Sequence, residues 1–167
     1  VDPGLLAHLQ RAEGLDVDTL DRILNKESGL KGLSGLGNDL RDIEAAAAEG
    51  NEEAQLAIHV YTHRIRKYIG AFAALMGGVD AIVFTAGVGE NSALVRRRGS
   101  QNLSFLGARL DDEANRVAEL TTDDDVVQIS TPTSRAHLLV IKTNEEYAIA
   151  RDTASLVLEE DRVNAPK

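Results

Sequence analysis

The 167-residue chain contains no cysteine and no tryptophan, and only three phenylalanines and three tyrosines. Without cysteine, the chain can form no disulfide, no thiolate metal site and no cysteine nucleophile. Because aromatic side chains are scarce, Leu, Val, Ile and Ala must build the hydrophobic core. No stretch is continuously apolar over the ~18 residues that a membrane span needs, so we expect no membrane partner.

Positive charge is also in short supply. The chain has 18 Lys and Arg against 27 Asp and Glu, which gives a formal net charge of −9 and argues against a nucleic-acid partner. Residues 1–4 lack the basic and apolar segments of a signal peptide and do not start with methionine. We therefore expect a cytoplasmic protein whose sequence begins inside a longer chain.

The hydrophobic pattern predicts more helices than strands. Four glycines between residues 29 and 37 predict a loop, because glycine inside a helix carries a large entropic cost. Late in the chain strands alternate with helices, which indicates an α/β layer with a helical insertion. The predicted helices cover residues 5–13, 17–25, 39–48, 52–76, 92–98, 111–119 and 144–159, the strands 80–85, 126–129 and 138–141, and an acidic turn 121–125 and a frayed tail 163–167 complete the chain.

The stretch from residue 80 to 98 is the most informative segment, because an apolar strand ends in glycines and a helix follows. This arrangement holds nucleotides in many α/β proteins. Gly87 and Gly89 can adopt backbone angles that other residues resist, and their missing Cβ atoms let a ligand approach the main chain. A dinucleotide fingerprint would need a third glycine where Ser92 stands, so a dehydrogenase is a poor interpretation.

Three segments together resemble one family. DAIVFTAGVGENSALVRRR (residues 80–98) is similar to the adenosine-binding segment of the acetate kinase family, which belongs to the actin-like ATPase superfamily. SGLKGLSG followed by NDLRD (residues 28–42), and TNEE through IAR (residues 143–151), resemble two further elements of that family in the same order. The resemblance implies that residues 1–167 form a single domain. This would be the C-terminal, ribonuclease H-like domain of a longer two-domain kinase whose N-terminal domain is absent here.

The resemblance also implies an adenosine site. Gly87 and Val88 would pack against the adenine, the main chain of Gly89 and Glu90 would shape the pocket, and the Asn91 amide would offer a hydrogen bond to the nucleoside. Taken alone, the same turn could be an ordinary connection between a strand and a helix.

Asp39, Leu40 and Arg41 would form the opposite wall of the adenosine slot. Without the resemblance, Asp39 reads as a helix cap and Arg41 as a solvated charge. A planar guanidinium can stack on a purine ring, which gives Arg41 a role that lysine would fill poorly.

Glu145 would hold the Mg²⁺ that accompanies ATP or ADP, through water, because magnesium keeps several waters and takes few carboxylates. The alternative is that Glu145 and Glu146 only favour the positive end of a helix dipole. Asn144 would cap this helix in either case. Lys142 departs from the proline that is common before this segment in the family.

The activity implied is the interconversion of ATP and acetate with ADP and acetyl phosphate. Phosphoryl transfer needs cationic groups that this chain does not gather, so the isolated chain should be inactive. The resemblance implies that the catalytic residues lie upstream of Val1. The family also implies a homodimer. A propionate or butyrate kinase relative, a non-catalytic actin-like nucleotide-binding module and a structural domain without a ligand remain alternatives.

Overall fold

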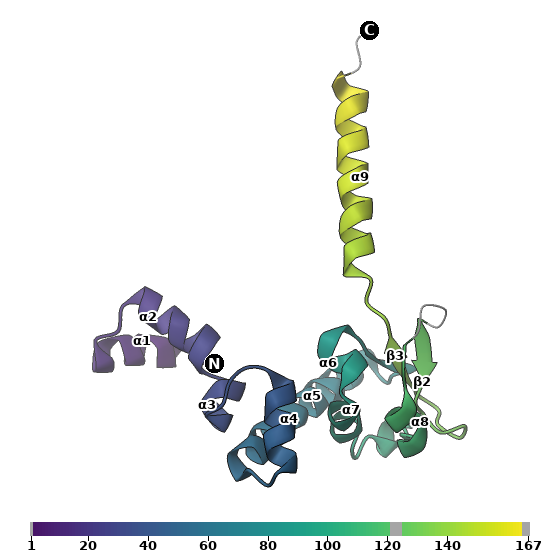
Figure 1. Ribbon diagram of the computed structural model, residues 1–167, viewed down its shortest axis with the longest axis horizontal. Helices are drawn as coiled ribbons and strands as arrows, with labels where there is room; N and C mark the ends of the chain where they lie inside the picture. Colours follow the sequence, from purple (N-terminus) through teal and green to yellow (C-terminus); the bar gives the residue numbers. More distant parts are fainter. Residues whose placement is uncertain (1, 121–124, 165–167) are drawn as a thin grey trace.

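The computed structural model describes residues 2–120 and 125–164, which form helices around a small sheet (Figure 1). The first helices, α1 (Pro3–Glu13) and α2 (Val17–Arg22), lie at one end of the molecule, away from the sheet. A π-helical turn, η1 (Ile23–Glu27), follows α2 directly, so helical structure extends beyond residue 25, where the sequence analysis ends it.

The predicted loop over residues 29–37 is wrong in part, because it contains a short helix, α3 (Leu30–Ser34). The glycines mostly flank this helix and do not interrupt it. Gly29 precedes it with φ 63° and Gly35 ends it in the left-handed conformation with φ 69°. Both backbone angles are ones that glycine adopts without steric cost, so the glycines mark the ends of the helix.

The helical layer consists of α3, α4 (Leu40–Ala48) and the long α5 (Glu52–Met76), and α5 confirms the predicted single helix. Asn51 caps α5 by accepting the Ala54 N–H at 2.8 Å, and Gly77 ends the helix with φ 73°. Ile43 and Ile58 are fully buried between α4 and α5. This apolar contact fixes the start of α4 relative to the rest of the molecule.

The sheet contains three strands in the described part of the chain, in the order β1 (Ala81–Phe84), β3 (His137–Ile141), β2 (Val126–Gln128). β1 and β3 are parallel, with Ile82 opposite Leu138 and Phe84 opposite Val140, whereas β2 is antiparallel to β3. These four side chains alternate with more exposed ones along their strands and are buried in one core. The three predicted strands are therefore confirmed.

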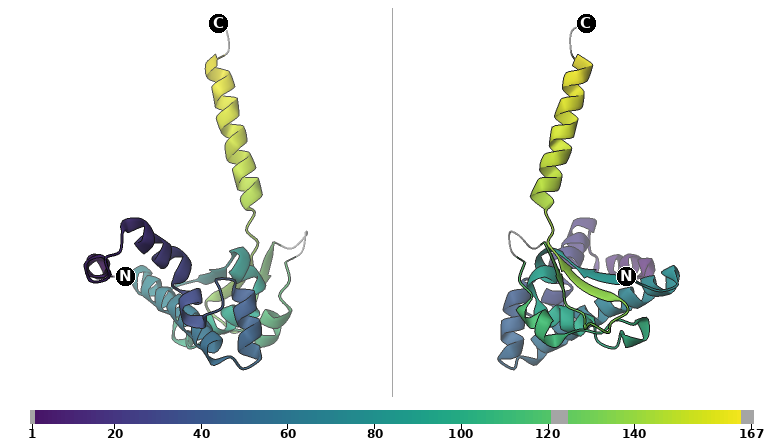
Figure 2. Two further views of the ribbon diagram at one scale, coloured as in Figure 1. Left: turned by 60° about the vertical axis from the view of Figure 1, so that its left-hand side comes forward. Right: turned by 90° about the vertical axis from the view of Figure 1, so that its right-hand side faces the viewer.

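Of the remaining helices, the last one extends away from the sheet and the others lie beside it (Figure 2). The glycine stretch after β1 is itself a short helix, α6, where the sequence analysis places a turn. The last helix, α9, is longer than predicted and takes in residues 163 and 164 of the predicted tail. Residues 121–124 of the predicted acidic turn and residues 165–167 of the predicted tail lie outside the described residues. The bounds are α6 (Ala86–Asn91), α7 (Ala93–Gly99), the 3₁₀ turn η2 (Ser104–Leu106), α8 (Asp112–Val117) and α9 (Glu145–Asn164).

The parallel pairing of β1 and β3 positions the candidate site. Parallel strands end at the same edge of a sheet, so the segment after β1 and the segment after β3 lie side by side. The first leads into α6 and the second into α9, which stands away from the body of the molecule (Figures 1 and 2). Over the described ranges, none of the helices combines the length and the apolar character needed to cross a membrane.

Candidate functional site

The larger of two hollows beside α6 has a volume of about 710 Å³ and lies between α6 and the start of α4. It brings together two segments that are almost 50 positions apart in the sequence. The predicted residues on this hollow are Asp39, Leu40 and Arg41 on one wall, and Gly87, Val88 and Asn91 on the other. Gly89 and Glu90 do not line it.

The second hollow, of about 490 Å³, lies between α6 and the segment from Lys142 to the start of α9. Glu90, Glu145 and Glu146 contribute carboxylates to it. Gly87 lines both hollows, and a Cβ atom built on Gly87 would meet nothing within 4 Å. The two hollows therefore adjoin at Gly87, where no neighbouring atom lies close to the missing Cβ position.

The two glycines of α6 serve different purposes. A Cβ atom on Gly89 would lie 2.9 Å from the main-chain carbon of Phe84, so Gly89 is needed for α6 to pack against β1. Neither Gly87 nor Gly89 has a positive φ; the left-handed residue is Ala86, with φ 58°. The open approach to the main chain that was expected at the two glycines is found at Gly87. The unusual backbone angle that was expected there is found at Ala86 instead.

The α4 wall is held by Asp39, which caps the helix by accepting the Arg41 N–H at 2.9 Å. The Arg41 guanidinium also donates to both carboxylate oxygens of Asp39, at 3.0 and 2.6 Å. These hydrogen bonds lower the pKa of Asp39 to about 2. The Arg41 side chain is 89% exposed, so the face of its guanidinium is open to a planar ligand.

On the opposite wall, Asn91 donates a side-chain hydrogen bond to the carbonyl oxygen of Gly87 at 2.8 Å. This contact orients the amide beside the larger hollow. Val88 is half-buried and packs against the α4 and α5 core, so it offers an apolar surface whose position is fixed.

The sequence analysis did not assign to the site five residues that line the larger hollow: Leu30, Asn38, Glu44, Tyr61 and Ser92. Ser92 donates to the Glu44 carboxylate at 2.5 Å, and Tyr61 lines the hollow from α5. Glu44 lies one helical turn after Leu40, so helical spacing could have placed it on the same face. Tyr61 carries no local signal, because only the packing of α5 brings it to the site.

At the second hollow, Asn144 caps α9 by accepting the Tyr147 N–H at 3.0 Å, as predicted. Within residues 2–120 and 125–164, no three metal-binding side chains converge closely enough to hold an ion by themselves. Glu145 is exposed at the first turn of α9, facing the hollow.

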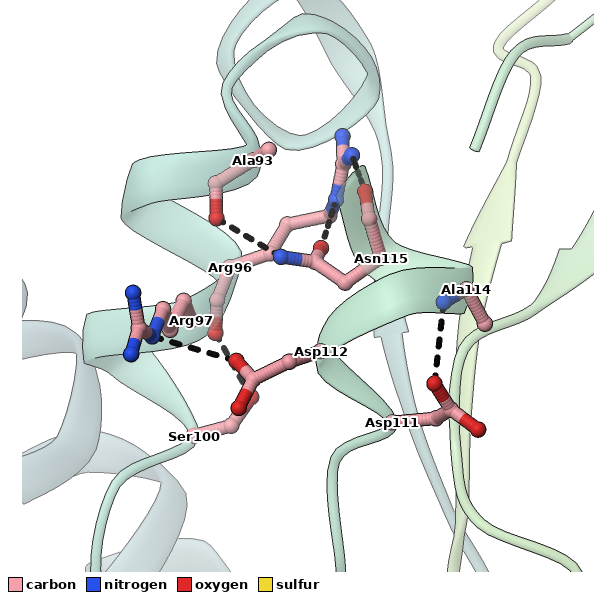
Figure 3. A network of polar contacts seen from close by, with 8 residues as sticks. All are labelled: Ala93, Arg96, Arg97, Ser100, Asp111, Asp112, Ala114 and Asn115. Atoms are coloured by element: carbon pink, nitrogen blue, oxygen red, sulfur yellow. Dashed lines mark hydrogen bonds and ion pairs between the residues drawn. The ribbon is translucent and has the colours of Figure 1, made fainter. Parts of the chain in front are cut away.

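A buried arginine braces the base of α6. Arg96 is 2% exposed, and its guanidinium donates to the carbonyl oxygens of Gly89 and Glu90 at 3.0 and 2.7 Å. It also donates to the side-chain and main-chain oxygens of Asn115 at 2.8 and 2.9 Å (Figure 3). Burial lowers the pKa of Arg96 from its ordinary value. The sequence alone does not distinguish Arg96 from Arg97 and Arg98. Among these three arginines, Arg96 is the one at a buried position of α7.

A parallel strand pair whose following segments flank two adjoining hollows, with helices packed alongside, defines an α/β domain. The chain belongs to the acetokinase family, whose model matches residues 1–151. This confirms the resemblance found in the sequence.

Relatives with known names are close in sequence over most of this chain. The acetate kinases of Clostridioides difficile and Halothermothrix orenii are 50% and 47% identical over 157 residues. These matches cover 94% of the chain but only 38% of each relative. The chain therefore spans well under half the length of the curated relatives it matches.

Solved structures give the same result. The acetate kinase of Porphyromonas gingivalis superposes with a TM-score of 0.84 and 44% identity, over 94% of this chain and 38% of that one. A propionate kinase from Francisella tularensis superposes with a TM-score of 0.76 and 35% identity, over 87% of this chain and 36% of that one. The predicted fold class is confirmed.

Proposed function

We propose that residues 1–167 are the C-terminal domain of a longer acetate kinase, which interconverts ATP and acetate with ADP and acetyl phosphate. The observation that carries the proposal is the pair of hollows that meet at Gly87 in a member of the acetokinase family. In this proposal the chain supplies the adenosine wall and a magnesium ligand.

The adenosine would occupy the larger hollow. Val88 and Gly87 offer an apolar, open surface to one face of the adenine, and the exposed guanidinium of Arg41 can approach from the other wall. Asn91 provides the polar contact. The main chain of Gly89 and Glu90 would shape the slot from behind through its hydrogen bonds to Arg96.

The phosphates would then cross Gly87 into the second hollow, where Glu145 lies. Magnesium fits the donors there, because one or two exposed carboxylates together with waters and phosphate oxygens satisfy its coordination without a protein cage. When bound, the ion would neutralise phosphate charge during transfer. Glu145 would orient it through water.

The catalytic groups would come from the remainder of the protein. Among the described side chains that line the two hollows, the cationic ones are Arg41 and Lys142. Transfer to a carboxylate spreads negative charge over the phosphoryl oxygens and needs several preorganised cations. We therefore propose that this domain alone is inactive. From the membership of the acetokinase family we also propose that the complete protein is a cytoplasmic homodimer.

The test uses the full-length protein that contains this chain. We expect acetyl phosphate to form from ATP, Mg²⁺ and acetate, and calorimetry to show ADP binding that Gly87→Val and Asn91→Ala both weaken. Arg97→Ala, on the exposed face of α7, serves as the control and should bind normally. Failure of the full-length protein to bind ADP would overturn the proposal.

A propionate kinase is the second candidate, because the Francisella tularensis structure superposes well on this chain. Comparing the rates with acetate, propionate and butyrate separates these possibilities. ADP binding without formation of any acyl phosphate would instead indicate a non-catalytic nucleotide-binding module.

A further inference from the structure

Glu145 lies at the foot of α9, a helix that stands away from the sheet and the helical layer (Figures 1 and 2). The position of its carboxylate therefore depends on the segment that joins α9 to β3. The N–H of Lys142 donates to the carbonyl oxygen of Asp125, the residue before β2, at 2.9 Å. Thr143 is the next residue, two positions before Glu145, and it is tied to α6.

Thr143 makes three hydrogen bonds across the gap between the two segments. Its N–H donates to the carboxylate of Glu90 at 2.8 Å, and its hydroxyl oxygen accepts the N–H of Ala86 at 2.9 Å. The hydroxyl groups of Thr143 and Thr85 also bond to each other. Of these contacts, the one with Glu90 is the only one made to the main chain of Thr143, so it acts directly on the path of the backbone into α9.

Glu90 is well suited to hold another segment because its own main chain is fixed. The carbonyl oxygens of Gly89 and Glu90 accept hydrogen bonds from the buried guanidinium of Arg96, which Asn115 braces from α8 (Figure 3). Asn115 in turn donates to the carbonyl oxygen of Ala93 at 3.0 Å. The half-buried side chain of Glu90 thus extends from a rigid base toward the second hollow.

We propose that Glu90 is a positioning residue: its carboxylate, by accepting the Thr143 N–H, sets the distance between Glu145 and Gly87. This inference rests on the proposed function, because it concerns how a metal-bound nucleotide would span the second hollow. The sequence analysis assigns only the main chain of Glu90 to the site, whereas the structure gives its side chain a separate task.

Two substitutions separate positioning from charge. Glu90→Gln keeps the length of the side chain and an oxygen that can accept the Thr143 N–H, but it removes the charge. Glu90→Asp keeps the charge but is shorter by one methylene. Because Arg96 holds the main chain at position 90, we expect the shorter side chain to lose the hydrogen bond to Thr143. Glu113→Ala, on the exposed face of α8, is the control for general effects of removing a carboxylate.

The experiment measures ADP affinity of the full-length protein by calorimetry, with Mg²⁺ and with EDTA, and hydrogen exchange at the Thr143 amide. We expect Glu90→Asp to weaken the affinity in Mg²⁺ by up to about tenfold, the usual range for one hydrogen bond, and to leave the affinity in EDTA unchanged. The Thr143 amide should exchange faster. Glu90→Gln should match the wild type within about twofold in both measurements.

The reverse pattern, with Glu90→Gln impaired and Glu90→Asp normal, would show that Glu90 acts through its charge and would overturn the inference. Equal behaviour of both variants and the wild type would overturn it too. Thermal melting of each variant shows whether it is folded. If the wild type binds no ADP, the proposed function fails, but faster exchange of Thr143 in Glu90→Asp alone would still show that the contact holds the segment.

Discussion

Replacing Arg96 with alanine should destabilise the domain far more than replacing its neighbour Arg97. Arg96 is 2% exposed and satisfies four oxygen acceptors, two on Gly89 and Glu90 and two on Asn115. Leaving these acceptors without a donor costs about 1 kcal/mol each when water can enter part of the vacated space, or about 4 kcal/mol in all. For a domain of this size, that loss lowers the melting temperature by roughly 8–16 °C.

The assay is thermal unfolding followed by circular dichroism, with Arg97→Ala as the matched control. Arg97 lies next to Arg96 on α7, but its side chain is 61% exposed and pairs with Asp112 at 3.1 Å. An exposed pair of this kind contributes less than about 1 kcal/mol. If the two variants melted within about 2 °C of each other, the argument that Arg96 braces α6 would be refuted, because a difference of about 3 kcal/mol must appear as several degrees.

Further expectations concern α6 and the α4 cap. Gly89→Ala places a Cβ atom 2.9 Å from the main chain of β1 and should cost about 1–3 kcal/mol in denaturant unfolding, whereas Gly87→Ala meets open space and should leave stability nearly unchanged. Ala86→Gly should be neutral or stabilising by about 1 kcal/mol, since φ is 58°, while Ala45→Gly in the exposed middle of α4 should lose about 1 kcal/mol. In the folded protein the pKa of Asp39 is about 2, below its ordinary value. The stability that ionised Asp39 contributes is therefore present above about pH 4 and is lost as the pH falls toward 2. Asp39→Asn should remove that part of the pH dependence of the melting temperature.

The segments that carry the site could be read from the sequence because their signals are local. An apolar run, a glycine pair and a following amphipathic stretch specify β1, the glycine segment and α7 within 20 positions, although the glycine segment forms the helix α6 and not the predicted turn. Asn144 marks the start of α9 in the same way. Asp39, Leu40 and Arg41 lie across the larger hollow from Gly87, and their role in binding adenosine stays a prediction.

The contacts that fix these segments could not be read, because they depend on tertiary packing. Arg96 is one of three consecutive arginines, and only the docking of α7 against α8 buries it. Tyr61 reaches the hollow because α5 packs on α4. The short helix α3 was missed because the glycines around it look the same in a loop as at the ends of a helix.

The position of α9 has a mechanical consequence. Twenty residues of α-helix extend about 30 Å, so a rotation of about 10° around Asn144 would move the far end of the helix by roughly 5 Å. The same rotation would shift Glu145, at the pivot, by a small fraction of that distance. A small change of direction in the segment after β3, beside the second hollow, would therefore become a large displacement at the far end of α9.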